Sequence, residues 1–202
     1  MNADDFFNVL RSRRSVRAFT DQVPDRALLD RLFEAAQWAP SNHHRQGWKF
    51  LVFQDAARIG VLAERVRQAL SDHLASANRL LASQGQELLH FATLFAKAPV
   101  VVLAMHKKSP AVGKALVLAG GNRYASGEAL STAMAVQNLL LMAHVLGLGA
   151  CVMTAPLLVP AVWESLDLPA GFEPTCLVAV GYPAQTPAPP RRKSAEHVVE
   201  YR

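Results

Sequence analysis

The chain has 202 residues, of which 51% are hydrophobic and 18% are charged, and this suits one domain over residues 1–202 with a sizeable buried core. Its net charge of +5 would suit a nucleic acid, an anionic membrane surface or a phosphate-bearing ligand. The basic residues gather at 11–17 and 191–193 without alternating with aromatic residues, which favours two local anion sites and argues against a nucleic-acid-binding track.

Helical and strand-like patterns follow one another irregularly in the first half of the chain. Pro24 suits the first turn of a helix whose apolar face is Leu28, Leu29, Leu32, Phe33 and Ala36. The predicted elements, in order, are a helix over 3–12, an extended segment over 13–19, the helix from Pro24 to about Ala39, a strand over 48–53, and helical residues 56–96 with a break at Gly85.

The second half contains a continuous apolar run at residues 100–104, which is typical of a central strand. Residues 106–126 have no clean period, and we expect a loop or short mobile helix there that sets substrate choice. Further strands are predicted near 150–153 and 176–181, before an extended, basic tail that starts at 183. These elements indicate an α+β domain without regular βαβ alternation; the strand order cannot be read from them.

The helix predicted at residues 128–146 is apolar on almost every face. A helix of this kind must be buried on all sides. In a domain this small, one of its faces needs a second subunit. The pattern therefore predicts an oligomer.

No apolar run reaches the ~20 residues that cross a bilayer. The first residues include Asp4 and Asp5, where a signal peptide would be basic. We therefore expect a cytoplasmic protein that does not bind membranes. Cys151 and Cys176 lie in apolar surroundings and form neither a disulfide framework nor a metal-ligand spacing, so two buried free thiols are expected.

Three guanidinium groups and a hydroxyl occur within residues 13–17. In an extended chain Arg13, Ser15 and Arg17 point the same way. They would present two forked donors and a hydroxyl to one anion, which matches a phosphate monoester. A solvated basic strand or a cluster at a helix C-terminus is the alternative.

Polar side chains also gather between the second helix and the first strand, at residues 41–46. A turn of this composition can offer amide, imidazole and hydroxyl groups to the edge of a heterocycle. The neighbours His43 and His44 suggest a metal site as the alternative. Adjacent histidines point apart, however, and no cysteine or carboxylate stands at ligand spacing nearby, so no metal is expected.

These two segments resemble the nitroreductase family, whose patterns are Arg-Arg-Ser-x-Arg-x-Phe and Ala-Pro-Ser-x-x-Asn-x-Gln-Pro-Trp. They stand here at residues 13–19 and 39–48, with His44 in place of the asparagine and Gly47 in place of the proline. Residues 135–149 resemble the family's central helix and its glycine ending, and residues 181–193 resemble its close. The four matches occur in the family's order and cover nearly the whole chain.

The resemblance implies a mostly antiparallel sheet flanked by helices, in an intertwined homodimer with FMN at the subunit interface and residues 183–202 as an extended C-terminal arm. The implied FMN contacts come from four stretches of the chain: Arg13, Arg14, Ser15 and Arg17; Pro40, Ser41, Asn42, His44 and Gln46; Met153, Thr154 and Ala155; Arg192 and Lys193. The first and last stretches would hold the phosphate and ribityl chain, and the second would reach the flavin of the partner subunit. The third stretch would pass near the ring.

The implied activity is NAD(P)H-dependent reduction of a small organic acceptor, such as a nitroaromatic or a quinone, in a ping-pong cycle. No catalytic side chain is expected, because the flavin carries the chemistry. The candidate substrate contacts are Phe95, Arg123 and Tyr124. The competing interpretations are core packing for the two aromatic residues and a solvated surface position for the arginine.

Three other functions remain open. The resemblance also admits enone reduction, reductive dehalogenation and oxygen-dependent flavin breakdown. A flavin-binding redox module without efficient turnover would keep the same motifs. A nucleic-acid binder built on the two basic clusters would leave the ordered motifs unexplained.

Overall fold

The computed structural model describes residues 2–75, 79–108 and 127–202. Within them, four strands form one sheet of order β1-β2-β4-β3, and every neighbouring pair is antiparallel. The strands are β1 (Trp48–Phe53), β2 (Val100–Lys107), β3 (Gly149–Met153) and β4 (Phe172–Gly181). The predicted mostly antiparallel sheet is therefore confirmed.

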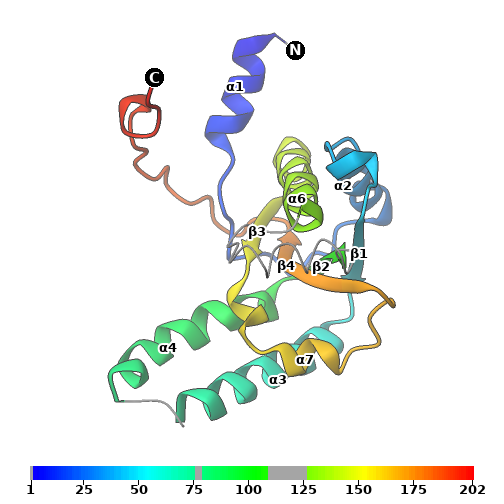
Figure 1. Ribbon diagram of the computed structural model, residues 1–202, viewed down its shortest axis with the longest axis vertical. Coiled ribbons are helices and arrows are strands. Elements are labelled where there is room, and N and C mark those ends of the chain that lie inside the picture. Colours follow the sequence, from blue (N-terminus) through cyan, green and yellow to red (C-terminus); the bar gives the residue numbers. More distant parts are fainter. Residues whose placement is uncertain (1, 76–78, 109–126) are drawn as a thin grey trace.

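Helices cover both faces of this sheet (Figure 1). On one face α2 and α6 pack against the sheet, and on the other face α3, α4 and α7 do so. The helices are α1 (Ala3–Ser12), α2 (Arg26–Gln37), α3 (Ala56–Ala75), α4 (Arg79–Thr93), α6 (Gly127–Val145) and α7 (Pro160–Glu164). Short 3₁₀ helices are η1 (Asn42–His44), η2 (Leu94–Lys97), η3 (Ala155–Leu158) and η4 (Ala195–His197).

Strand β2 shows why a continuous apolar run is a central strand. Its side chains alternate between the two faces, as in any strand. Val100 and Val102 join the core beneath α2 and α6, whereas Val101 and Leu103 join the core beneath α3 and α4. Because both faces are covered by helices, both sets of side chains are buried and apolar.

Two helix boundaries differ from the predictions. Helix α2 begins at Arg26, because the Asp25 side chain accepts a hydrogen bond from the Leu28 N–H at 2.8 Å and caps the helix. Pro24 thus precedes the cap. Gly85 lies inside α4 and does not break it. A Cβ there would lie 2.9 Å from the Leu74 side chain, so this glycine lets α4 pack closely on α3.

Helix α6 is buried on one side only in a single chain. Its inner face, which includes Ala135 and Leu139, packs on α2 and the sheet. Its outer face carries apolar side chains that are largely exposed, Leu130 at 52% and Val145 at 58% among them. The expectation that α6 is buried on all sides is not met within one chain. This apolar outer face is the physical reason to consider a second subunit.

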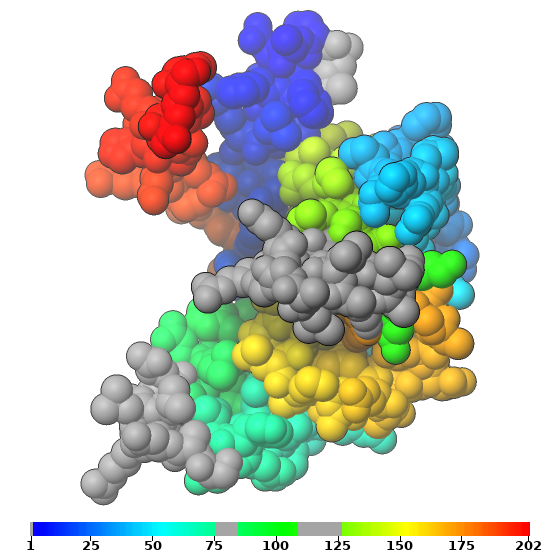
Figure 2. Space-filling view, viewed as in Figure 1, coloured from blue at the N-terminus to red at the C-terminus, as the bar shows by residue number. Residues whose placement is uncertain are grey.

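Helix α1 and the C-terminal residues both project from the body of the molecule (Figures 1 and 2). No residue of α1 is buried, although Phe6, Phe7 and Leu10 are large and apolar. At the other end Tyr201 is 95% exposed. Apart from η4 and the bridge at Pro183, residues 183–202 have no helix or strand.

The segment expected to be a loop or mobile helix, residues 106–126, begins instead as strand, because His106 and Lys107 pair with β4. Residues 109–126 lie outside the described residues. Across the described ranges, none of the helices combines the length and apolar character that a bilayer crossing requires.

Cys151 and Cys176 are free and buried, as predicted. Burial raises the pKa of both thiols, that of Cys176 to about 12, while the Arg17 and Arg13 guanidiniums partly offset the rise at Cys151. We expect neither thiol of the folded protein to react with a disulfide reagent near pH 8, because thiolate is the reactive form. Both should react after unfolding. A fast reaction of the folded protein with the disulfide reagent would contradict this expectation.

The same shift sets an alkaline limit on stability. A thiol whose pKa rises on folding stabilises the folded protein below its unfolded pKa, and this contribution is lost as the pH rises. For Cys176 the contribution is intact below its ordinary value of 9.0 and declines between there and about 12. Urea unfolding of the wild-type protein and of Cys176→Ala at a series of alkaline pH values measures this contribution to the free energy of unfolding.

Candidate functional site

The extended segment 13–19 lies along the outer edge of β3. Ser15 pairs with Ala150 in parallel orientation, and the Val16 N–H donates to the Ala150 carbonyl at 3.1 Å. Phe19 then pairs with Pro183 at the start of the C-terminal arm. The segment is therefore held at two points, by β3 at Ser15 and by the start of the C-terminal arm at Phe19.

Gly149 makes this close approach possible. A Cβ at this position would lie 2.7 Å from the Val16 Cβ, a distance that side chains do not tolerate. Since both atoms belong to short, stiff groups, segment 13–19 would have to move away from β3.

Gly149→Ala should therefore lower the free energy of unfolding by about 1–3 kcal/mol, the usual cost of overpacking. The matched control is Gly60→Ala in α3, where an added Cβ meets nothing within 4 Å. That change should raise the stability by about 0.5–1 kcal/mol, because alanine favours a helix. Urea unfolding measures both, and equal effects would contradict the steric account.

The three arginines of the segment have different roles. Arg14 donates from Nη1 to the carbonyls of Arg11 at 2.6 Å and Arg13 at 2.8 Å. It thereby satisfies carbonyl groups at the end of α1 that have no partner within the helix. Arg17 is exposed and makes one long contact, 3.5 Å, to the Ser15 carbonyl. Within the described part of the chain, the half-buried Arg13 side chain makes no hydrogen bond, so its donors remain available.

A cavity of about 220 Å³ opens beside these residues, between the end of α1, the end of α6 and the start of β3. Arg13 and Arg14 line it together with Gly149. His144, from the last turn of α6, also lines it and lies 2.7 Å from the Ser12 hydroxyl, measured from Nε2 to Oγ. The cavity is cationic and has room for a small anionic group.

Residues 41–46 form a strained loop at the other end of α6. His43, His44 and Gln46 have φ angles of 51°, 54° and 48°, a left-handed conformation that is uncommon for residues other than glycine. The Ser41 hydroxyl accepts from the Gln46 N–H at 3.0 Å, and the side chains of Gln46 and His44 are 3.2 Å apart. Such strain persists only where the surroundings enforce it, and it is frequent at functional sites.

A buried carboxylate anchors this loop to α6. Glu128 Oε1 lies 3.4 Å from Asn42 Nδ2 and 3.3 Å from Arg45 Nη1, and the Asn42 N–H donates to the Ser131 hydroxyl at 2.9 Å. The Asn42 side chain is thus used inside its own chain, while Pro40, His44 and Gln46 are exposed. Sequence reasoning missed Glu128 and Ser131, because their contacts span more than 80 residues.

The predicted site residues fall into separate places within one chain. None of residues 40–46 lines the cavity beside Arg13, and neither do Arg192 and Lys193, which are exposed on the C-terminal arm. At the end of β3, Thr154 is exposed and Ala155 is half-buried, whereas Met153 belongs to the core. Ser15 is half-buried beside β3.

One predicted substrate contact is wrong. Phe95 is 0% exposed and lies in the core between α3, α4 and the sheet. It follows α4 directly in η2, which turns its ring beneath β2. A ring in that place packs the core and cannot stack on a ligand. Arg123 and Tyr124 lie outside the described residues.

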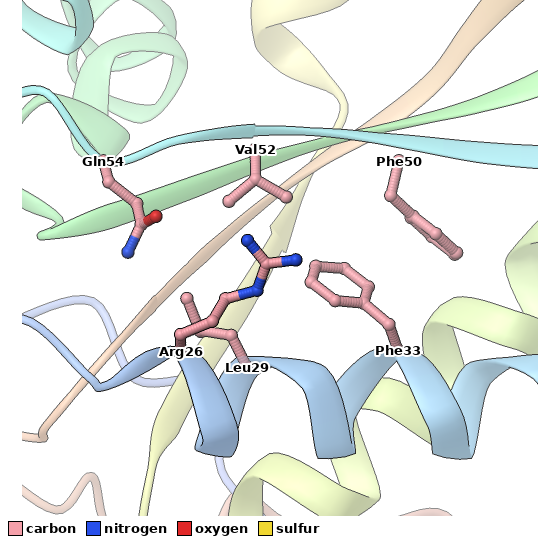
Figure 3. Close-up of a pocket in the computed structure, with 6 residues that line it drawn as sticks. All are labelled: Arg26, Leu29, Phe33, Phe50, Val52 and Gln54. Atoms are coloured by element: carbon pink, nitrogen blue, oxygen red, sulfur yellow. The ribbon is translucent and has the colours of Figure 1, made fainter.

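A second cavity, of about 280 Å³, lies between α2 and β1 (Figure 3). The rings of Phe33 and Phe50 face each other there with centroids 5.4 Å apart. Arg26 and Gln54 add polar groups to its lining. This cavity shares no lining residue with the cationic one, so the two are distinct. None of the predicted site residues lines it.

The described residues form an α+β protein with an antiparallel sheet between two helical layers, a cationic cavity at the edge of the sheet and a strained polar loop. The sequence model of the Nitroreductase family matches residues 10–182. The chain therefore belongs to the nitroreductase family, as its motifs predicted. Members of this family are flavoproteins with varied flavin chemistry.

Two similar proteins have different names. The chain is 31% identical over 197 residues to an NADH dehydrogenase of Thermus thermophilus, covering 94% of this chain and 92% of that protein. It is 31% identical over 190 residues to a 5,6-dimethylbenzimidazole synthase of Rhodobacter capsulatus, covering 91% of this chain and 86% of that protein.

Solved structures share the fold over the full chain. A BluB-like flavoprotein from Clostridium difficile superposes with a TM-score of 0.82 at 21% identity, covering 100% of this chain and 99% of that one. A nitroreductase with bound FMN from Bacteroides fragilis superposes with a TM-score of 0.73 at 21% identity and the same coverage. The nitroreductase-like fold is thus established, and the family and relatives indicate an oxidoreductase.

Proposed function

We propose that the protein is an FMN-dependent oxidoreductase that takes electrons from NAD(P)H and reduces a small organic acceptor, such as a nitroaromatic or a quinone. The observation that carries this proposal is the cationic cavity beside Arg13, where the N-terminal motif, the end of α6 and the start of β3 meet. Its donor set fits a phosphate monoester, the anionic group of FMN.

Within this cavity Arg13 would hold the phosphate with its uncommitted guanidinium. Ser15 and Arg17 do not line the cavity, and they would contact the ribityl chain farther along the segment. Gly147 and Gly149 bring main chain to the cavity wall without side chains in the way. Arg14 would mainly fix the conformation of the chain around the site, because its Nη1 donates hydrogen bonds to main-chain carbonyls at the end of α1. Arg192 and Lys193 would reach the phosphate only if the C-terminal arm closes on it.

Strand β3 would set the distance between the phosphate and the ring. From Gly149 to Met153 it advances about 13 Å at the usual rise of a strand, which suits a phosphate and a ribityl chain. The main chain of Met153, Thr154 and Ala155 would then face the ring edge. Bound FMN would supply the redox chemistry, accepting hydride from the nicotinamide and passing electrons to the acceptor.

The ring side of the site would be completed by a second copy of the chain, in a homodimer. Loop 41–46 is strained and polar, but it does not reach the cavity of its own chain. The outer face of α6, all of α1 and the C-terminal arm leave apolar side chains exposed, and a dimer would bury them. Ser41, His44 and Gln46 would then meet the partner's flavin.

Steady-state kinetics with NADH or NADPH and a nitroaromatic or quinone acceptor tests this activity. Varying one substrate at several fixed concentrations of the other should give parallel double-reciprocal lines, as expected when donor and acceptor use one site in turn. Intersecting lines would contradict the ping-pong cycle. Binding of FMN without turnover of any acceptor would favour the non-catalytic redox module.

Oxygen-dependent breakdown of the flavin is a second candidate. It is favoured by the 31% identity to a 5,6-dimethylbenzimidazole synthase and by the TM-score of 0.82 to a BluB-like flavoprotein. Incubation of the protein with FMN, NADH and air, followed by chromatography and mass spectrometry, separates the two. Loss of FMN with a benzimidazole product supports this second function. Intact FMN with rapid acceptor reduction supports the first.

A further inference from the structure

The wall of the cationic cavity contains a histidine that the family motifs did not assign. His144 lies in the last turn of α6, and its Nε2 is 2.7 Å from the hydroxyl of Ser12, the last residue of α1. The two residues are 132 positions apart in the sequence. Both line the cavity that Arg13 and Arg14 also line.

The hydrogen bonds around Ser12 decide which ring nitrogen carries the proton. The Ser12 hydroxyl has one hydrogen to donate. Ser12 Oγ lies 2.6 Å from the carbonyl oxygen of Asn8, and the hydroxyl donates its hydrogen to that carbonyl. Ser12 Oγ must therefore accept from His144, so Nε2 carries the hydrogen in the neutral ring. Within the described residues Nδ1 has no hydrogen-bond partner. It accepts when the ring is neutral and donates only when the ring is protonated.

Burial and the charges in the cavity both favour the neutral ring in the absence of an anion. The pKa of His144 is lowered by burial, then by the Arg13 and Arg14 guanidiniums. These two arginines are the charged residues that line the cavity beside the histidine. A phosphate bound between them would offset both positive charges and offer an acceptor to a protonated Nδ1.

We propose that His144 is a further ligand of the phosphate group, and that it takes up a proton from solvent on Nδ1 as the phosphate binds. Ser12 is the positioning residue that holds the ring in the required orientation. This inference rests on the proposed function, since it takes the phosphate of FMN as the ligand. It adds a proton to the binding reaction and involves no covalent step.

The consequence is a pH dependence of cofactor affinity with a definite sign. Binding raises the pKa of His144 relative to the empty site, so affinity is greatest at low pH and falls as the pH rises through the range where the ring titrates. The phosphate of FMN also titrates, with a second pKa of about 6. A variant that removes only the histidine isolates the protein's contribution.

Calorimetric titration of the flavin-free full-length protein with FMN, in two buffers of different ionisation enthalpy near pH 7.5, counts the protons taken up. His144→Gln keeps an N–H for the Ser12 hydroxyl but cannot be charged. We expect it to take up several tenths of a proton fewer than wild type, and to bind FMN about three- to tenfold more weakly near pH 6.5. The difference should vanish above about pH 9.

Two controls accompany this titration. His90→Gln, a surface change on α4, should behave as wild type. Riboflavin should show no difference among the three proteins.

The outcomes separate the two proposals. If wild type binds FMN but His144→Gln takes up the same number of protons, the role of His144 is overturned while the flavin site stands. If wild type does not bind FMN, both fall. NMR titration of the His144 ring in unaltered protein gives an independent readout. Its pKa must rise on addition of FMN and stay unchanged with riboflavin, and an unchanged pKa with FMN would overturn the inference without any variant.

Discussion

Arg13→Ala is expected to weaken FMN binding about ten- to a hundredfold, because a hydrogen bond to a charged group contributes about 1.5–3 kcal/mol. Arg13 is half-buried, lines the cationic cavity and has no hydrogen bond of its side chain among the described residues, so the substitution removes a donor without breaking an existing contact. Flavin fluorescence during titration measures the affinity. Riboflavin binding should change little, because it lacks the phosphate.

The matched control is Arg58→Ala in α3. It removes the same charge from a side chain that is 81% exposed and pairs only loosely with Asp55, at 3.9 Å. It should leave FMN affinity within about twofold, because exposed charges interact weakly. If both variants lose affinity equally, net charge and not the cavity governs binding. Full affinity in Arg13→Ala would mean that the phosphate lies elsewhere.

Phe95→Ala is expected to lower the free energy of unfolding by about 3–5 kcal/mol, the range for removing a buried phenylalanine ring. The ring is 0% exposed and belongs to the core between α3, α4 and the sheet. Its removal loses the free energy of burying the ring, and it also leaves a cavity in which the neighbouring side chains lose their packing contacts. Urea unfolding of flavin-free protein measures the change, since bound cofactor would add its own stabilisation.

Phe91→Ala provides the comparison from the same part of the chain. Phe91 lies on α4, is 41% exposed and contacts the ring of His90 edge-on. Its loss should cost under about 1 kcal/mol, as for most surface changes. Equal effects at the two positions would contradict the core assignment of Phe95. A Phe95→Ala protein of normal stability with a raised KM for the acceptor would restore the substrate role.

Local patterns predicted the elements whose signals are local. The helix at 3–12 coincides with α1, and the strand at 48–53 coincides with β1. The apolar run at 100–104 predicted the central strand β2. The strand order could not be predicted, because the partners in β2 and β4 are far apart in sequence, from Lys107 with Phe172 to Val100 with Val180, and no local pattern encodes that choice.

The extended form of segment 13–19 was predictable, because one short motif carries it. The extended segment of Arg13, Ser15 and Arg17 lies beside β3, as an extended chain must to pair with it. The contacts of His144 with Ser12 and of Glu128 with Arg45 were not predictable, because each joins residues that are far apart in sequence.

Two sequence-based interpretations failed for related reasons. An isolated aromatic residue such as Phe95 does not reveal from its own identity whether it packs the core or faces a ligand. An isolated glycine such as Gly85 can break a helix or admit a neighbouring side chain, and here it admits Leu74. In both cases the neighbour that decides the matter comes from another element.

The most direct test of the proposed function is an absorbance titration of the purified protein with FMN, followed by anaerobic addition of NADH and then NADPH. The account predicts binding at micromolar FMN and bleaching of the visible flavin band by at least one nucleotide. A protein that neither retains nor takes up FMN at that concentration would contradict the flavin site, and the proposed enzyme with it.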